Sequence, residues 1–128
     1  MDTPREGETI TYERTFTVEE VRRFAEISGD TQPRHTEPDG DGRVMVQGLL
    51  TATMPTKLGG DREVLAPRMS FEFVEPVYTG ERITCLATYD AVTERADGYA
   101  FTWDVVCEND AGDTVIEATI DGIVRDAE

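Results

Sequence analysis

The sequence predicts an α+β domain in which a curved antiparallel sheet of five or more strands wraps around one central helix at about residues 47–58. Several segments between residues 69 and 124 alternate apolar and polar residues, which is the pattern of strands with one buried face. Residues 47–58 contain one charged residue, Lys57, and are rich in Leu, Ala, Thr and Met, as in a buried helix. Because a sheet must cover its apolar face, we expect this helix to fill its concave side.

The chain is expected to begin with an edge strand over residues 8–16 and a helix over residues 18–28. The apolar side chains of the strand are those of Ile10, Tyr12 and Phe16. Thr17 offers an N-cap hydroxyl, and Glu20 follows three residues later as its capping-box partner. Gly29 supplies the residue that accepts a left-handed backbone at a helix C-terminus.

Residues 29–45 are polar, and prolines and glycines interrupt them, so we expect an ordered loop there. Loops of this length are usually functional. In the central helix after it, Pro55 removes one backbone donor, and we expect it to kink the last turn. Gly59 and Gly60 follow the predicted end of that helix.

Four strands are expected in the rest of the chain, and turn signals at residues 78–80, 96–98 and 109–112 separate them. Their inward-facing residues are predicted to be Met69, Phe71 and Phe73; Ile83, Cys85, Ala87 and Tyr89; Tyr99, Phe101, Trp103, Val105 and Cys107; and Ile116, Ala118, Ile120 and Val124. Such a sheet leaves free edges and an apolar rim. We therefore expect a homodimer, or a dimer of dimers.

The length and the net charge of the chain limit the number of domains and the partners that we expect. The 128 residues fit a single domain over 1–128, and a formal net charge of −15 argues against nucleic-acid binding, which needs clustered Lys and Arg. An acidic chain with a single lysine suggests adaptation to high salt, a halophilic protein. No apolar run is long enough to cross a membrane and no signal-peptide core is evident, so we expect a cytoplasmic protein and no membrane partner.

Cysteine and acidic residues do not indicate a metal site. Cys85 and Cys107 fit no metal-binding spacing, and we expect both to be reduced and buried. The alternative is a disulfide between them, which is not favoured. The stretch Asp39-Gly40-Asp41-Gly42 lacks the further ligands of a calcium loop and is expected to be a turn. No metal is predicted.

The segment from Ile27 to His35 contains the single histidine of the chain and is the strongest candidate for a functional site. Asp30 follows the predicted helix end, and His35 comes five residues later, beyond Pro33. A tight loop can bring both side chains together, where an imidazole and a carboxylate can hold a water for acid–base catalysis. The alternative is a turn-forming Asp and an exposed loop His.

This segment resembles the signature of the MaoC-like dehydratases and (R)-specific enoyl-CoA hydratases, Gly-Asp-x-Asn-Pro followed by an aliphatic residue and His. Gly29, Asp30, Pro33 and His35 match it, whereas Gln32 stands in place of the Asn and an arginine in place of the aliphatic residue. Residues 45–52 are similar to the family's approach to the central helix, and residues 71–80 to its strand ending in Pro-Val and a Gly turn. The resemblance therefore spans nearly the whole chain.

The resemblance implies a hot-dog fold and a hydro-lyase that adds water to trans-2-enoyl-CoA or dehydrates (R)-3-hydroxyacyl-CoA. It implies that Asp30 and His35 form the catalytic dyad and that the Gly48 N–H polarises the thioester carbonyl. Gln32, Gln47 and Thr56 fall at further site positions, where the family commonly has Asn, His and a pocket-lining hydroxyl. No cofactor is implied, because coenzyme A arrives as part of the acyl-CoA substrate.

Two other functions stay open. One is a hot-dog acyl-CoA thioesterase, in which a carboxylate activates water against the carbonyl carbon. The other is a non-catalytic domain that binds an acyl chain or pairs with a catalytic relative, which the glutamines at 32 and 47 make conceivable. The arginine candidates for binding coenzyme A phosphates are Arg34, Arg43, Arg62 and Arg68.

Overall fold

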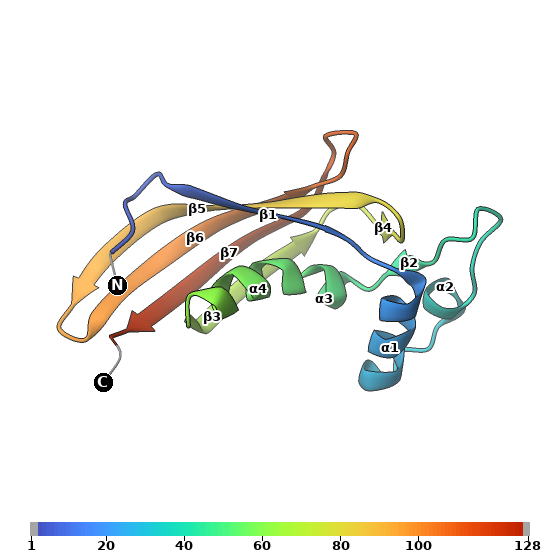
Figure 1. Cartoon of the computed structure of the whole chain (residues 1–128), viewed down its shortest axis with the longest axis horizontal. Coiled ribbons are helices and arrows are strands. Elements are labelled where there is room, and N and C mark those ends of the chain that lie inside the picture. Colours follow the sequence, from blue (N-terminus) through green and yellow to red (C-terminus); the bar gives the residue numbers. More distant parts are fainter. Residues whose placement is uncertain (1–2, 127–128) are drawn as a thin grey trace.

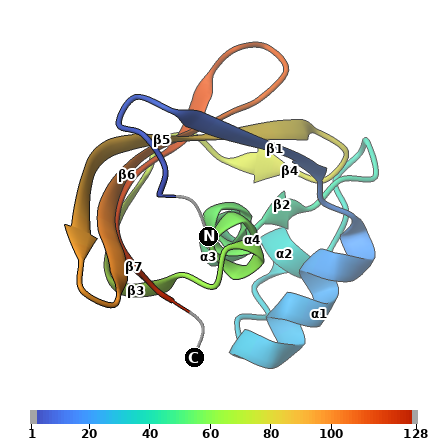
Figure 2. The same ribbon diagram turned by 60° about the vertical axis from the view of Figure 1, so that its left-hand side comes forward.

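A computed structural model describes residues 3–126, in which a five-stranded antiparallel sheet curls around a helical axis (Figures 1 and 2). The strand order is β1-β5-β6-β7-β3. These strands are β1 (Thr9–Thr15), β3 (Leu65–Phe73), β5 (Arg82–Arg95), β6 (Gly98–Glu108) and β7 (Thr114–Arg125). The predicted α+β class and the hot-dog arrangement of sheet and helix are therefore confirmed, and residues 8–16 lie at a sheet edge as expected.

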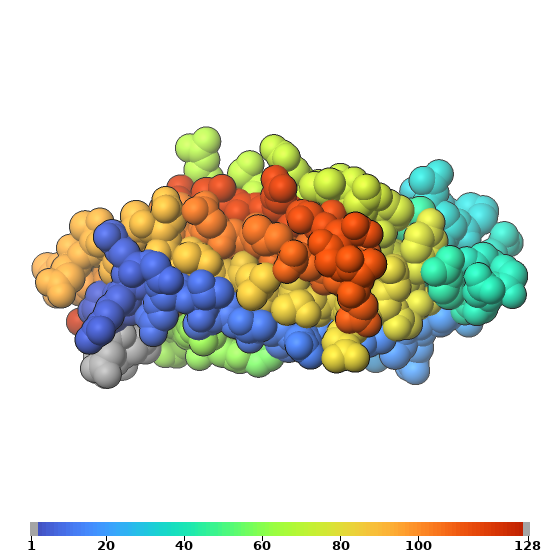
Figure 3. All heavy atoms as spheres, turned by 90° about the horizontal axis from the view of Figure 1, so that it is seen from above, coloured from blue at the N-terminus to red at the C-terminus, as the bar shows by residue number. Residues whose placement is uncertain are grey.

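Four helices and a small second sheet complete the structure. The helices are α1 (Val18–Ser28), α2 (Pro33–Thr36), α3 (Gly48–Thr51) and α4 (Thr53–Asp61). The second sheet pairs β2 (Met45–Val46) with β4 (Val77–Tyr78). Figure 2 shows α3 and α4 on the concave side of the sheet, while α1 and α2 lie at its open side. Seen from above, the atoms of neighbouring chain segments lie side by side as bands of different colour (Figure 3).

The first helix has the bounds and the caps that the sequence predicts. The Thr17 hydroxyl accepts from the Glu20 N–H at 3.1 Å, and the Glu20 carboxylate accepts from the Thr17 N–H at 2.9 Å. These reciprocal bonds, with the Arg14 guanidinium nearby, hold the pKa of Glu20 below its usual value. Gly29 closes the helix with φ +78°, a left-handed conformation that glycine adopts without strain. The direction of the chain leaving α1 is thereby set locally.

The central helix differs from the prediction in three respects. It is interrupted at Ala52, between α3 and α4. The reason is that Pro55 has no N–H to donate to the backbone carbonyl one turn earlier in the helix. The irregularity therefore lies before Pro55 and not in the last turn, where it was predicted. The helix continues through Gly59 and Gly60 to Asp61. It is also not buried on every side, since Leu49 is 65% exposed.

The loop predicted over residues 29–45 contains the short helix α2, whose first residue is a proline.

The inward-facing residues of β5, β6 and β7 are buried as predicted and form the core with α4. The prediction is wrong for β3, where Met69 is 44% exposed and Phe73 is 51% exposed. β3 is the second edge of the sheet, so one flank of its apolar face has no neighbouring strand in the single chain. This surface is the apolar rim that the sequence led us to expect.

Cys85 and Cys107 are free and buried, and they face each other directly across β5 and β6. The hydrogen bond with the neighbouring Cys85 thiol, together with burial, raises the pKa of Cys107 far above its usual value, so this thiol stays protonated. No helix within residues 3–126 is long and apolar enough to span a membrane.

Candidate active site

Two local signals bring Asp30 and His35 together. The left-handed Gly29 ends α1 and turns the chain toward Asp30, and Pro33 then starts α2, which carries His35. Oδ2 of Asp30 lies 3.5 Å from Nε2 of His35. The His35 side chain is 8% exposed and the Asp30 side chain is 39% exposed. The imidazole is thus held inside the fold, while the carboxylate is partly exposed.

The second ring nitrogen of His35 determines the tautomer. Nδ1 lies 2.7 Å from the carbonyl oxygen of Met45, and because a carbonyl can only accept, Nδ1 carries the hydrogen and donates it. In the neutral imidazole, Nε2 therefore presents its lone pair toward Asp30. Two acceptors 3.5 Å apart can both receive a hydrogen bond from one water placed beside them.

Gln32 contacts both members of this pair. Its Nε2 donates to Oδ1 of Asp30 over 2.7 Å, and its backbone carbonyl accepts from the His35 N–H over 2.9 Å. The Gln32 amide is the main cause that lowers the pKa of Asp30, and the nearby charges of His35 and Arg34 act in the same direction. Asp30 is therefore an ionised carboxylate, with Oδ2 directed toward His35.

Met45 connects the dyad to an apolar cavity of about 220 Å³. While its carbonyl holds His35, Met45 also lines this cavity with Gly48, Thr51, Phe73, Glu75 and several apolar residues. A Cβ added at Gly48 would lie 2.8 Å from the ring of Phe73, so the aromatic ring approaches the start of α3 closely. Among residues 3–126, no group accepts a hydrogen bond from the Gly48 N–H. Neither Asp30 nor His35 lines the cavity itself.

Two predicted site residues lie apart from the dyad. Gln47 is 5% exposed, and its Nε2 donates to the carbonyl of Val21 over 3.0 Å, which ties the start of α3 to α1. Thr56 is exposed on α4, its hydroxyl donates to the Ala52 carbonyl, and it does not line the cavity beside Gly48. The structure thus gives Gln47 a buried structural contact, and it brings Thr56 to neither the dyad nor the cavity.

Sequence reasoning missed Met45, Thr51 and Phe73. The Met45 carbonyl could not be found from residue type, because any residue supplies this acceptor. Thr51 falls in the predicted helix three residues after Gly48, a spacing that places both near one face, and this signal could have identified it. Phe73 was expected in the core because it alternates with Phe71.

The candidate arginines for coenzyme A are scattered. Arg34 is exposed beside Asp30, and Arg68 is exposed on β3. Arg43 lies over the Tyr78 ring at 4.5 Å and near Asp39, whose carboxylate accepts from backbone N–H groups of the predicted turn. Arg62 lies at the end of α4, away from the dyad. No common phosphate site follows from these positions.

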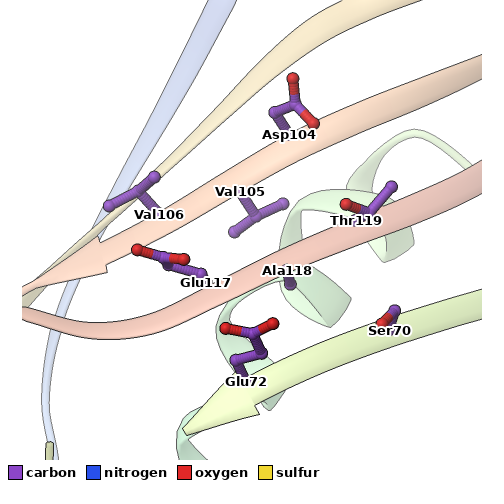
Figure 4. Close-up of a pocket in the computed structure, with 8 residues that line it drawn as sticks. All are labelled: Ser70, Glu72, Asp104, Val105, Val106, Glu117, Ala118 and Thr119. Atoms are coloured by element: carbon purple, nitrogen blue, oxygen red, sulfur yellow. The ribbon is translucent and has the colours of Figure 1, made fainter. Parts of the chain in front are cut away.

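A depression of about 260 Å³ on the outer face of the sheet carries the carboxylates of Glu72, Asp104 and Glu117 (Figure 4). Glu72 and Glu117 stand directly opposite each other on β3 and β7. Within residues 3–126, no group of three or more His, Cys, Asp or Glu is arranged to hold a metal ion. We assign no ligand to this depression.

Known proteins resemble the chain in sequence and in fold, although no protein-family model matches it. The mitochondrial 3-hydroxyacyl-[acyl-carrier-protein] dehydratase of Arabidopsis thaliana is 25% identical over 123 residues, covering 91% of this chain and 72% of that protein. The (R)-hydratase of A. caviae involved in PHA biosynthesis superposes with a TM-score of 0.84 at 21% identity, covering 97% of this chain and 99% of its own. The MaoC-like dehydratase of Rhodospirillum rubrum gives a TM-score of 0.77 at 17% identity, covering 98% and 96%. The chain therefore has the hot-dog fold, and its resemblance to the MaoC-like dehydratases is confirmed.

Proposed function

We propose that this chain is a hydro-lyase that adds water to the double bond of a trans-2-enoyl thioester and, in reverse, dehydrates an (R)-3-hydroxyacyl thioester. The observation that carries the proposal is the 3.5 Å approach of Asp30 Oδ2 to Nε2 of His35, whose Nδ1 is bound to the Met45 carbonyl. The Arabidopsis relative is named as a dehydratase of 3-hydroxyacyl groups, which supports this class of reaction.

In this proposal Asp30 and His35 have different roles in the proton transfers. Asp30 accepts one hydrogen of the bound water and orients it, while Nε2 of His35 removes the other hydrogen as the water oxygen bonds to C3. The resulting imidazolium is stabilised by the Asp30 carboxylate and returns its proton to C2 on the same face. Water is consumed, one O–H remains on C3, and both side chains end in their starting state.

Gly48 is proposed to stabilise the enolate that forms between these two proton transfers. Its N–H is unpaired within residues 3–126 and lines the apolar cavity, where a donor to the thioester oxygen gains strength from the exclusion of water. This scheme requires no metal and no cofactor, since coenzyme A or acyl carrier protein enters as part of the substrate.

A homodimer is proposed as the functional form. The exposed face of β3 with the nearby start of α3 exposes five large apolar side chains: Leu49, Leu65, Met69, Phe73 and Val74. Because β3 is a sheet edge, a second copy can extend the sheet and cover this surface. Phe73 lines the cavity at this edge, so dimerisation would also close the site.

Hydration of crotonyl-CoA by the full chain, followed by loss of enoyl absorbance, tests the reaction. Asp30→Asn and His35→Gln are expected to lower kcat by about 10²–10⁴-fold, because each removes a proton-transfer group. Asp41→Asn, in the loop that follows α2, is the matched control and should retain full activity. Release of free thiol in place of hydration would identify a thioesterase, and binding of acyl-CoA without turnover would identify a non-catalytic domain. Full hydration activity in a folded Asp30→Asn variant would refute the dyad.

A further inference from the structure

A second cavity lies at the opposite end of the helical axis from Asp30 and His35. Its volume is about 670 Å³, and it is lined by the N-terminal segment, the start of β1, the residue that ends α4, and residues of β5 and β6. Figure 1 shows the start of β1 and the end of α4 at one end of the molecule, with α1 and α2 at the other. Pockets of this size commonly bind small molecules.

One wall of this cavity is fixed by hydrogen bonds between the N-terminal segment and β5. The Gly7 N–H donates to the Tyr89 carbonyl over 2.7 Å, and the Tyr89 N–H donates to the Glu8 carbonyl over 2.9 Å. The Glu6 carboxylate accepts from the Val92 N–H over 2.9 Å. The segment therefore continues the pairing beyond β1, and the wall belongs to the folded structure.

Arg62 supplies a positive charge to the cavity and forms no ion pair within residues 3–126. It caps the C-terminus of α4 and folds back so that one Nη donates to the Leu58 carbonyl over 3.0 Å, which fixes the guanidinium at the negative end of the helix dipole. No carboxylate within residues 3–126 lies within 4.0 Å of it, although the chain contains 27 acidic residues. Its remaining donors are available to a ligand.

Two tyrosines contribute hydroxyl groups to the same cavity. Tyr89 is 3% exposed and Tyr99 is 5% exposed, and both line the cavity. The Tyr89 hydroxyl lies beside the Arg62 guanidinium and the Trp103 indole. Burial raises the pKa of both phenols, with the Arg62 charge acting in the opposite direction, so both remain protonated donors at neutral pH.

We propose that this cavity binds a small amphipathic carboxylate, which accepts hydrogen bonds from Arg62, Tyr89 and Tyr99. A guanidinium matches the two oxygens of a carboxylate, and Pro4 and Ile10 offer an apolar surface for the tail of the ligand. The cavity also contains Arg5 and Glu8, and the Glu8 carboxylate accepts from the Arg5 N–H over 3.2 Å. The lining is thus net positive in a strongly negative protein. The site shares no residue with the proposed active site and does not depend on it.

Titration of the full chain with hexanoate, followed through the ring NMR signals of Tyr89 and Tyr99, tests the proposal. Hexanoate should shift both signals saturably with a Kd in the millimolar range, whereas hexan-1-ol, which has a similar tail and no charge, should bind at least about tenfold more weakly. Absence of a saturable shift, or equal affinity for the two probes, would overturn the proposal.

Variants separate recognition of the carboxylate from general binding to an open cavity. Arg62→Gln should weaken hexanoate binding about tenfold, Tyr99→Phe should weaken it several-fold, and Arg62→Lys should be intermediate. Arg82→Gln removes an exposed arginine at the other end of β5 and should leave binding unchanged. If Arg62→Gln does not fold, Arg62→Lys and Tyr99→Phe decide the question. Unchanged affinity in these variants would contradict the assignment.

Discussion

Gln32 donates from its side-chain amide to Oδ1 of Asp30 over 2.7 Å. Gln32 is the N-cap residue of α2, yet its side chain makes no capping bond to that helix. The amide is used for Asp30 instead, and the Gln32 carbonyl receives the His35 N–H. In the family that the sequence resembles, Asn occupies this position. The longer Gln here reaches the carboxylate directly.

Removing this donor should change the pH at which Asp30 titrates. In Gln32→Met the side chain keeps its approximate length but loses the hydrogen bond, so the pKa of Asp30 should rise. The Asp30 carboxylate should then take up its proton at a higher pH than in the wild-type protein. An NMR titration of the Asp30 carboxyl carbon measures this shift.

Gln32→Asn is the conservative comparison, because it keeps a side-chain amide. Its Asp30 pKa should lie between those of the wild-type protein and Gln32→Met. An Asp30 pKa that is identical in Gln32→Met and the wild-type protein would show that the amide has no electrostatic role.

Dimerisation is expected to use β3. Met69→Lys places a charge on the exposed apolar face of this edge strand, where Met69 is 44% exposed, and should weaken the dimer about tenfold or more. Thr11→Lys makes the matched change on β1, the opposite edge, and should leave the dimer intact. Sedimentation across a concentration series distinguishes them. A wild-type chain that stays monomeric at every concentration would exclude this form.

Salt should stabilise the fold, in part through the outer face of the sheet. Glu72 and Glu117 are paired directly across β3 and β7, so their charges repel in dilute buffer, where such a pair costs about 0.2–1 kcal/mol. In about 1 M salt the Debye length is about 3 Å and the repulsion is screened. Glu117→Gln should therefore raise the free energy of unfolding at low salt and have little effect at molar salt.

Urea denaturation at the two salt concentrations measures this difference. Glu94→Gln, which removes an exposed carboxylate facing Tyr99 across the strands, is the control and should have a smaller effect. If the wild-type protein is as stable in dilute buffer as in molar salt, the halophilic interpretation fails.

Local sequence determined much of the architecture. The period-two pattern in β5, β6 and β7 sets which face is buried, because a strand turns successive side chains to opposite sides. Thr17, Glu20 and Gly29 define both ends of α1 through contacts within a few residues. Even the order Asp30, Pro33, His35 predicts a convergent pair, since a helix end and a proline restrict the turn between them.

Tertiary structure decided what these elements do together. The His35 tautomer depends on the carbonyl of Met45, ten residues away, and the exposure of β3 depends on its place at the edge of the sheet. The second cavity brings Arg62 from a helix end together with Tyr89 and Tyr99 from two strands. Local patterns encode short-range hydrogen bonding and the buried face of each element. Contacts between residues distant in sequence arise only when the sheet curls around its helix, and so they cannot be derived from any one segment.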